Sequence, residues 1–143
     1  MDQKKTKVLM FGTFDILHPG HIKIFSEAAK LGDELYVVVA RDATVEKVKG
    51  RKTHYDEQTR LMHIRAVTCI TKVMLGSLDD KYAILDIVKP DIIALGYDQK
   101  FFIDKLEEEL VKRNLKTKII HLGPYKPQIY KSSKIRAKLD SNA

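Results

Sequence analysis

Two histidines stand three residues apart in a glycine-containing segment near the amino terminus. The segment reads Gly12-Thr13-Phe14-Asp15-Ile16-Leu17-His18-Pro19-Gly20-His21. Proline suits the first position of a helix, where no backbone amide is needed, so a helix is predicted to begin at Pro19. A helix start offers N–H groups without helical partners and a partial positive charge. His18 and His21 would both face that spot, which favours the binding of an anion such as a phosphate.

Three interpretations of this histidine pair are open. The two imidazoles could bind a metal ion, although no third ligand stands nearby in the sequence. They could make hydrogen bonds within the loop and have no ligand. They could stabilise phosphate groups, and this third interpretation is favoured because the glycines, the helix start and the end of a strand all agree with it. The segment matches neither of the two common glycine-rich phosphate-loop patterns.

Short apolar runs alternate five times with helical patterns along the chain. Strands are predicted at residues 7–11, 35–40, 72–75, 91–95 and 117–122, and helices at 19–31, 56–68, 81–88, 101–113 and 133–139. In the second helix Leu61, Met62, Ile64 and Ala66 are expected to face inward. This alternation predicts one doubly wound, Rossmann-like α/β domain over residues 1–143, with a five-stranded parallel sheet and helices on both faces. Ligands of such sheets bind at the carboxyl ends of the strands, where the histidine pair lies.

The composition of the 143 residues is that of a globular protein. Hydrophobic residues make up 44% and charged residues 31%, which excludes a disordered chain. A single cysteine, Cys69, excludes an internal disulfide and fits a reducing compartment, where it would be an inert core residue. No apolar run approaches the roughly 18 residues of a membrane span, and the first residues lack the apolar stretch of a signal peptide. We therefore expect a cytoplasmic protein without a membrane partner.

An excess of 26 basic over 19 acidic residues gives a formal net charge of +7 and favours anionic partners. The basic residues gather in two stretches without carboxylates, at 47–52 and at 126–138. Either stretch could simply be a solvated face. Nucleic acid is the partner ranked last, because the chain has no zinc-knuckle spacing, no RNA-binding aromatic signature and no repeated basic helix.

The segment from Gly12 to His21 resembles the signature of the cytidylyltransferase-like nucleotidyltransferase superfamily. Residues 131–136, Lys-Ser-Ser-Lys-Ile-Arg, are similar to the second signature of that superfamily. Within it, residues 40–42, 75–77 and 90–99 resemble the archaeal FAD synthases, whereas residues 70–77 and 127–130 depart from the glycerol-3-phosphate and choline-phosphate cytidylyltransferases. The chain lacks the cysteines near the carboxyl terminus that we associate with the archaeal group.

This resemblance implies the transfer of AMP from ATP to FMN, which yields FAD and pyrophosphate. Mg²⁺ or another divalent metal would come with the ATP, and no residues are assigned to a metal site of the protein's own. His18 and His21 would be the catalytic residues, and Lys49, Arg51 and Arg136 would supply charge to the phosphates. The nucleotide-binding residues implied are Thr13, Phe14, His18, Pro19, Gly20, His21, Asp98, Tyr125, Ser132 and Ser133.

Plainer roles and rival functions stay open at this point. Asp15 could only brace its loop, Asp98 could cap a turn, and Ser133 could be a simple helix cap. His54, His63 and His121 show no partner spacing and are expected to be structural or exposed. The rival functions are a CTP-dependent transferase, such as a glycerol-3-phosphate cytidylyltransferase, and a nucleotide-binding module without catalysis. Small sheets of this kind often pair, which makes a homodimer a candidate assembly.

Overall fold

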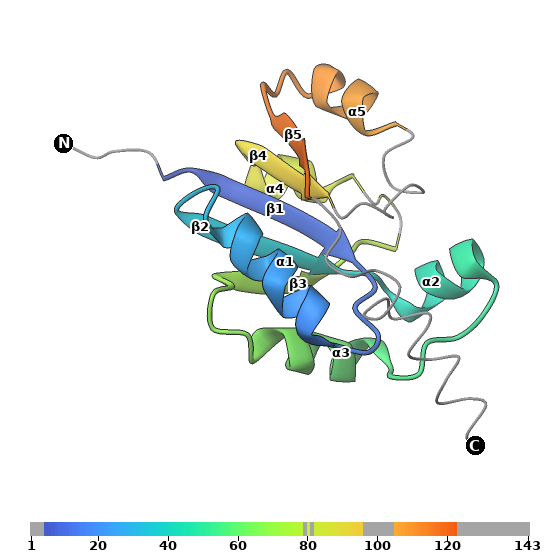
Figure 1. The fold of residues 1–143 in the computed structure, drawn as a ribbon. Helices are drawn as coiled ribbons and strands as arrows, with labels where there is room; N and C mark the ends of the chain where they lie inside the picture. Colours follow the sequence, from blue (N-terminus) through green and yellow to red (C-terminus); the bar gives the residue numbers. More distant parts are fainter. Residues whose placement is uncertain (1–4, 79, 81, 96–104, 123–143) are drawn as a thin grey trace.

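Five parallel strands form one sheet, in the order β3-β2-β1-β4-β5 (Figure 1). The computed structural model describes residues 5–78, 80, 82–95 and 105–122. The strands are β1 (Lys7–Gly12), β2 (Glu34–Val39), β3 (Lys72–Leu75), β4 (Ile92–Leu95) and β5 (Lys118–His121). The helices are α1 (Pro19–Ala29), α2 (Asp42–Lys49), α3 (Glu57–Arg65), α4 (Ile84–Val88) and α5 (Leu106–Lys112). The strand order reverses direction between β1 and β4, and this reversal is where such folds open a ligand crevice.

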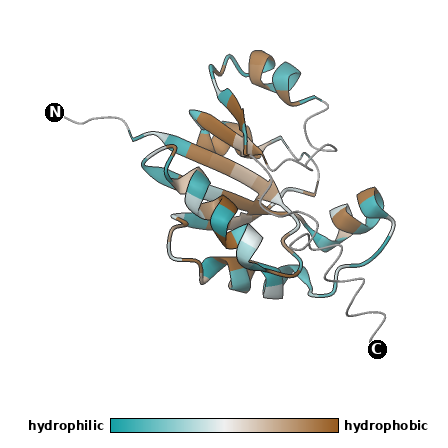
Figure 2. Ribbon diagram, in the orientation of Figure 1, coloured by the Kyte–Doolittle hydropathy of each residue, from teal (hydrophilic) through white to brown (hydrophobic). Residues whose placement is uncertain are grey.

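The core has two halves because successive residues of a strand point to opposite faces of the sheet. In β1, Val8 and Met10 join the cluster under α1 and α3, whereas Leu9 and Phe11 join the cluster under α4 and α5. Both faces of the central strands are therefore covered, which explains their continuous apolar sequence. Figure 2 shows this as mostly hydrophobic strands in the middle of the molecule, between helices that carry both hydrophobic and hydrophilic residues.

The structure confirms the predicted α/β fold with five parallel strands and helices on both faces. One helix, α2, was not predicted. It is a short, mostly polar helix in which Val45 is the one buried residue, so its sequence indicates a basic surface segment more clearly than a packed helix. In α3, Met62 is 66% exposed and Ala66 is exposed beyond the end of the helix, so their predicted inward orientation is wrong. The helix predicted at 133–139 lies outside the described residues.

A fully buried arginine on α3 ties together the loops at the carboxyl edge of the sheet. The guanidinium of Arg60 donates from Nη1 to the carbonyl of Thr13 (2.8 Å) and from Nε to the carbonyl of Tyr55 (3.1 Å). Its Nη2 pairs with Oδ1 of Asp42 at 2.7 Å. Thr13 follows β1, Asp42 begins α2 and Tyr55 precedes α3, so one side chain fixes three segments that are far apart in the sequence.

A reciprocal pair of hydrogen bonds extends this network to the neighbouring strand ends. The amide of Asp42 donates to Glu57 (2.9 Å), and the amide of Glu57 donates to Asp42 (3.0 Å). Arg41 pairs with Glu57 at 2.9 Å and donates from Nε to the carbonyl of Gly76 at 2.7 Å. Burial opposes the ionisation of Asp42, but hydrogen bonds from Arg60 and from the Glu57 amide outweigh it and hold the pKa of this carboxyl below its usual range.

We expect Arg60→Met to lower the free energy of unfolding by about 2–4 kcal/mol, because the carbonyl of Thr13 loses the guanidinium donor, and the carbonyl of Tyr55 and the carboxylate of Asp42 each lose one of their donors. The larger losses of stability that follow the breaking of fully buried ion pairs are not expected here, because the Asp42 side chain is 42% exposed and water can reach it. Urea denaturation measures the change. Arg65→Met is the matched control, because Arg65 is an exposed arginine on the same helix. Equal stabilities of the two variants would contradict the role given to Arg60.

Candidate active site

His18 caps the amino end of α1 with its own ring. Its backbone is extended (φ −145°, ψ 171°), and Nδ1 accepts a hydrogen bond from the amide of Gly20 at 3.1 Å. Pro19 occupies the first helical position, as the sequence predicts. Because Nδ1 is an acceptor, the proton of the neutral ring stands on Nε2. The cap therefore fixes both the orientation and the tautomer of His18.

The rings of His18 and His21 stack on each other at the helix start. Their centroids are 3.9 Å apart and their planes differ by 21°. The ring of Phe14 meets His21 edge to face, with centroids 5.7 Å apart, and packs on its other side against Phe25. The structure thus brings the two predicted catalytic histidines together, and it places the predicted nucleotide-binding residue Phe14 in contact with His21.

Phe14 reaches this position through an unusual backbone conformation. Its φ is +51°, in the left-handed region that non-glycine residues rarely adopt. The neighbouring Gly12 is required by the same packing, because a Cβ atom there would lie 2.5 Å from Cζ of Phe14. Such conformations persist where the surrounding structure over-determines them, and they gather at functional sites.

Burial keeps both imidazoles neutral near pH 7. Burial is the main cause that lowers the pKa of His21, and the nearby His18 ring lowers this pKa further. A hydrogen bond with the backbone of Ile16 raises the pKa but does not outweigh these two effects, and the resulting pKa of His21 is about 3. Burial also lowers the pKa of His18. Two neutral rings can stack closely, whereas two imidazolium ions would repel each other. A negatively charged ligand would shift both rings toward the protonated form.

Asp15 braces a second loop against the first. Its carboxylate is buried and accepts hydrogen bonds from the amides of His54 (2.7 Å) and Tyr55 (2.9 Å). This contact confirms the bracing role that the sequence left open for Asp15. The segment between α2 and α3 therefore lies directly beside the loop that carries the histidines.

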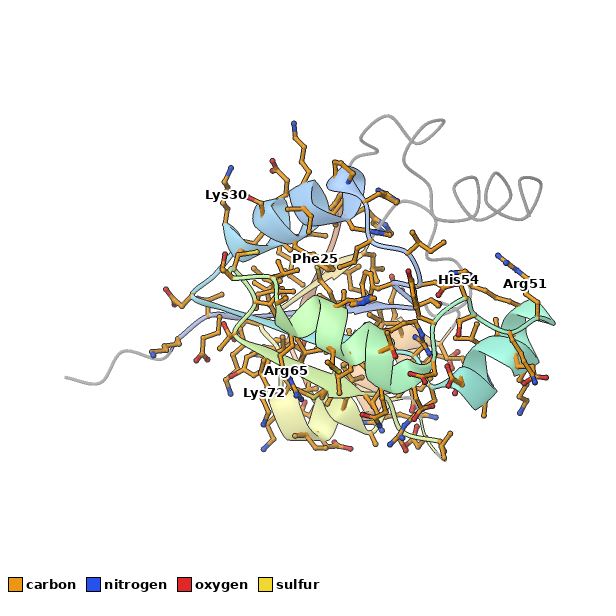
Figure 3. The ribbon with its side chains drawn as sticks, turned by 90° about the horizontal axis from the view of Figure 1, so that it is seen from below. Phe25, Lys30, Arg51, His54, Arg65 and Lys72 are labelled. Carbon is orange, nitrogen blue, oxygen red and sulfur yellow. The ribbon has the colours of Figure 1, made fainter. Side chains whose placement is uncertain are left out.

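The basic residues predicted to face phosphates sit at the end of α2. Lys49 is the last residue of that helix, Gly50 ends it in the left-handed conformation (φ +71°), and Arg51 is exposed beyond it. Figure 3 shows Arg51 and His54 on one side of α3, with Arg65 and Lys72 toward its other end. Figure 1 places α2 beyond the carboxyl ends of β1 and β2. The contribution of Lys49 and Arg51 to phosphate binding stays a prediction.

Comparison with known proteins identifies the family. The sequence model described as cytidylyltransferase-like matches residues 9–138. The chain belongs to the cytidylyltransferase-like family. The FAD synthase of Methanocella paludicola is 44% identical over 135 residues, which are 94% of this chain and 96% of that protein. The FAD synthase of Aciduliprofundum boonei is 48% identical over 119 residues, 83% of this chain and 79% of that protein.

Solved structures share the fold of this chain. A crystal structure described as the lipopolysaccharide core biosynthesis protein from Thermoplasma volcanium has a TM-score of 0.79 and 42% identity, over 85% of this chain and 99% of that one. The pantoate-β-alanine ligase of Francisella tularensis has a TM-score of 0.65 at 14% identity, over 96% of this chain and 67% of that one. The second likeness shows the fold alone.

The remaining predicted site residues divide into two groups. Thr13, Pro19 and Gly20 lie in the loop and first turn that hold the histidines. Asp98, Tyr125, Ser132, Ser133 and Arg136 lie outside the described residues.

Within the described part of the chain, no helix is long and apolar enough to cross a membrane. Among those same residues, no group of three or more histidine, cysteine or acidic side chains could hold a metal ion.

Sequence reasoning missed Arg60 and Tyr55, which hold the loops of this site in place. One signal was available for Arg60, because it directly precedes the buried Leu61 and stands four residues before the buried Ile64 on a short helix. An arginine at an inward-facing helical position indicates a buried partner. Nothing in the sequence distinguished Tyr55.

Cys69 lies in the turn after α3, partly buried against the core cluster under α1 and α3.

The neutral state of His21 predicts a loss of stability in acid. The unfolded chain titrates this group near pH 6.5 and the folded chain near pH 3, so below pH 6.5 the unfolded chain binds the additional proton. The stabilisation is complete above about pH 6.5 and is lost as the pH falls, by up to about 1.4 kcal/mol per pH unit. His21→Gln should lose this slope between pH 7 and pH 4 in urea unfolding. His121→Gln, at an exposed histidine, should keep it, and equal slopes for wild type and His21→Gln would refute the assignment.

Proposed function

We propose that this chain is an FMN adenylyltransferase, which transfers AMP from ATP to FMN and releases FAD and pyrophosphate. The observation that carries the proposal is its likeness to FAD synthases at 44–48% identity, which spans nearly the whole chain in the longest match. The histidine pair at the start of α1 provides the site at which two phosphate-bearing substrates would meet. We further propose that residues 1–143 act as one nucleotidyltransferase domain.

The reaction requires alignment and charge neutralisation more than proton transfer. A phosphate oxygen of FMN attacks the α-phosphorus of ATP, and the bond from that phosphorus to the oxygen bridging to the β-phosphate breaks. The nucleophile is already ionised at neutral pH, so the site needs no general base. The protein has to hold two anions in line and to stabilise the negative charge on the transferring group.

His18 supplies an N–H donor to the triphosphate, and His21, whose proton in the neutral ring is hydrogen-bonded to the backbone of Ile16, would donate a second one once it is protonated. Nε2–H of His18 is fixed by the hydrogen bond from Gly20 to Nδ1, and His21 is stacked beside it. Each ring is neutral without a ligand. The negative charge of a bound phosphate would raise the pKa of both imidazoles, so that the rings take up protons and place positive charge beside the phosphate. The amides of Thr13 and Phe14 and the positive end of α1 would face the same phosphates.

The other predicted residues complete the proposal. Asp98 and Tyr125 would contact the nucleoside, Ser132 and Ser133 would donate to phosphate, and Lys49, Arg51 and Arg136 would add positive charge. Mg²⁺ or another divalent metal would arrive as part of the ATP complex and neutralise part of the triphosphate charge. A cytoplasmic location and a homodimer stay predictions.

Incubation of the purified protein with Mg-ATP and FMN should yield FAD and pyrophosphate in equal amounts. Chromatography of the flavins and a coupled pyrophosphate assay measure the two products. CTP with glycerol 3-phosphate, tested beside them, should give no pyrophosphate. Product from the CTP pair alone would favour a cytidylyltransferase, and tight ATP binding without any pyrophosphate would favour a module without catalysis.

His18→Ala and His21→Ala should each lower kcat for FAD formation by about 10²–10³-fold, the loss expected for one transition-state donor. Lys30→Ala is the matched control, since Lys30 directly follows the opposite end of α1 and is exposed (Figure 3). The control should keep wild-type turnover. Near-normal kcat in both histidine variants would remove the roles proposed for the pair.

A further inference from the structure

Two rings of the α2–α3 loop and one ring from the last turn of α3 contact one another. We call His54, Tyr55 and His63 the aromatic corner. The ring of Tyr55 is nearly perpendicular to both neighbours, with centroids 4.7 Å from His54 and 5.0 Å from His63. Tyr55 is nevertheless 36% exposed. The corner is therefore a surface feature in which a solvent-facing ring is held at a defined angle.

The backbone of Tyr55 is fixed more firmly than that of an ordinary loop residue. Its amide donates to the buried carboxylate of Asp15, and its carbonyl accepts from the buried guanidinium of Arg60 and from the hydroxyl of Thr53. Buried charges are costly and are found where their hydrogen bonds are made in full. Here two of them hold one exposed aromatic residue, which is the arrangement expected of a preorganised contact for a ligand.

The corner lies next to the histidine site and on a particular side of it. Asp15, which holds Tyr55, is three residues before His18. α2 and α3 follow β2 in the chain, and α3 covers the half of the sheet formed by β2 and β3. The residues proposed for the nucleoside, Asp98 and Tyr125, instead follow β4 and β5 in the sequence. We therefore assign the second substrate to the β2–β3 side.

We propose that the aromatic corner binds the isoalloxazine ring of FMN, with Tyr55 as the main stacking contact and a determinant of acceptor specificity. This inference rests on the proposed function. An isoalloxazine ring is flat, wide and polarisable, and such rings stack favourably on aromatic side chains. A small acceptor such as glycerol 3-phosphate has no ring and would gain nothing from the corner. Tyr55 would therefore favour a flavin over other phosphates.

The test compares Tyr55→Leu, which removes the ring, with Tyr55→Phe, which keeps it. Tyr36→Leu is the matched control, because Tyr36 lies within β2 and pairs with Leu9 away from the carboxyl ends of the strands. We expect Tyr55→Leu to raise KM for FMN by about 10-fold, within the range measured for loss of one stacked base. KM for ATP should change by less than about twofold, because the contact between Tyr55 and the flavin ring is not part of ATP binding. Tyr55→Phe and Tyr36→Leu should stay close to wild type.

A second measurement reads binding without turnover. FMN titrated with protein in the absence of ATP should lose fluorescence on stacking, with wild type and with Tyr55→Phe but not with Tyr55→Leu. Circular dichroism and thermal unfolding establish that each variant is folded. Tyr55→Gln, which has no ring but keeps a polar surface side chain, replaces Tyr55→Leu if the latter does not fold.

The outcomes separate this inference from the proposed function. Absence of FAD formation by the wild type would overturn the proposed function, and the fluorescence titration would still report on the corner. FAD formation with unchanged KM for FMN and unchanged quenching in the ring-less variants would overturn the inference alone. A rise in KM for ATP without a rise for FMN would also overturn it, because the corner would then belong to the nucleotide.

Discussion

The buried guanidinium of Arg60 is the contact on which the geometry of the site depends. The carboxyl ends of parallel strands lie at one edge of the sheet, but the loops that follow them have no intrinsic reason to stay together. Arg60 joins the loop after β1, the start of α2 and the segment before α3 through hydrogen bonds of 2.7–3.1 Å. Its charge could not stay buried without Asp42 and the two carbonyls, so these groups determine one another's positions.

The histidine site shows how burial and charge set the starting state of a site for anions. The two stacked rings cannot both be charged without repelling each other, and burial favours the neutral form of each. The hydrogen bond from the Gly20 amide uses Nδ1 of His18, which leaves the N–H of the neutral ring on Nε2. A phosphate bound as proposed would meet the N–H of His18 already oriented, and protonation of His21 would follow the phosphate charge. The left-handed backbone of Phe14 supports this arrangement from below, because the Phe14 ring contacts His21.

The fold was largely predictable from the sequence because its strands are continuous apolar runs and four of its helices have local signals. Pro19, for example, predicts the start of α1. Val37, Val38 and Val39 form a continuous apolar run, which predicts a strand covered on both faces. α2 was not predicted because it is short and mostly polar and buries a single residue. The histidine pair was found because its spacing is local. Arg60 and Tyr55 were not, since their contacts with Thr13 and Asp15 join residues 40 or more positions apart.

The hydrogen bonds of Asp15 and Arg60 hold the backbone of the α2–α3 loop and leave its side chains free to differ. Asp15 and Arg60 bind the α2–α3 loop through the amides of His54 and Tyr55 and the carbonyl of Tyr55, all of which are backbone atoms. Backbone atoms are present whatever side chain a position carries. The loop is therefore held in place independently of the rings at positions 54 and 55, and those rings are available to contact a substrate. A change of acceptor can then arise at Tyr55 without disturbing the histidines, whereas a change at Asp15 or Arg60 would move both halves of the site at once.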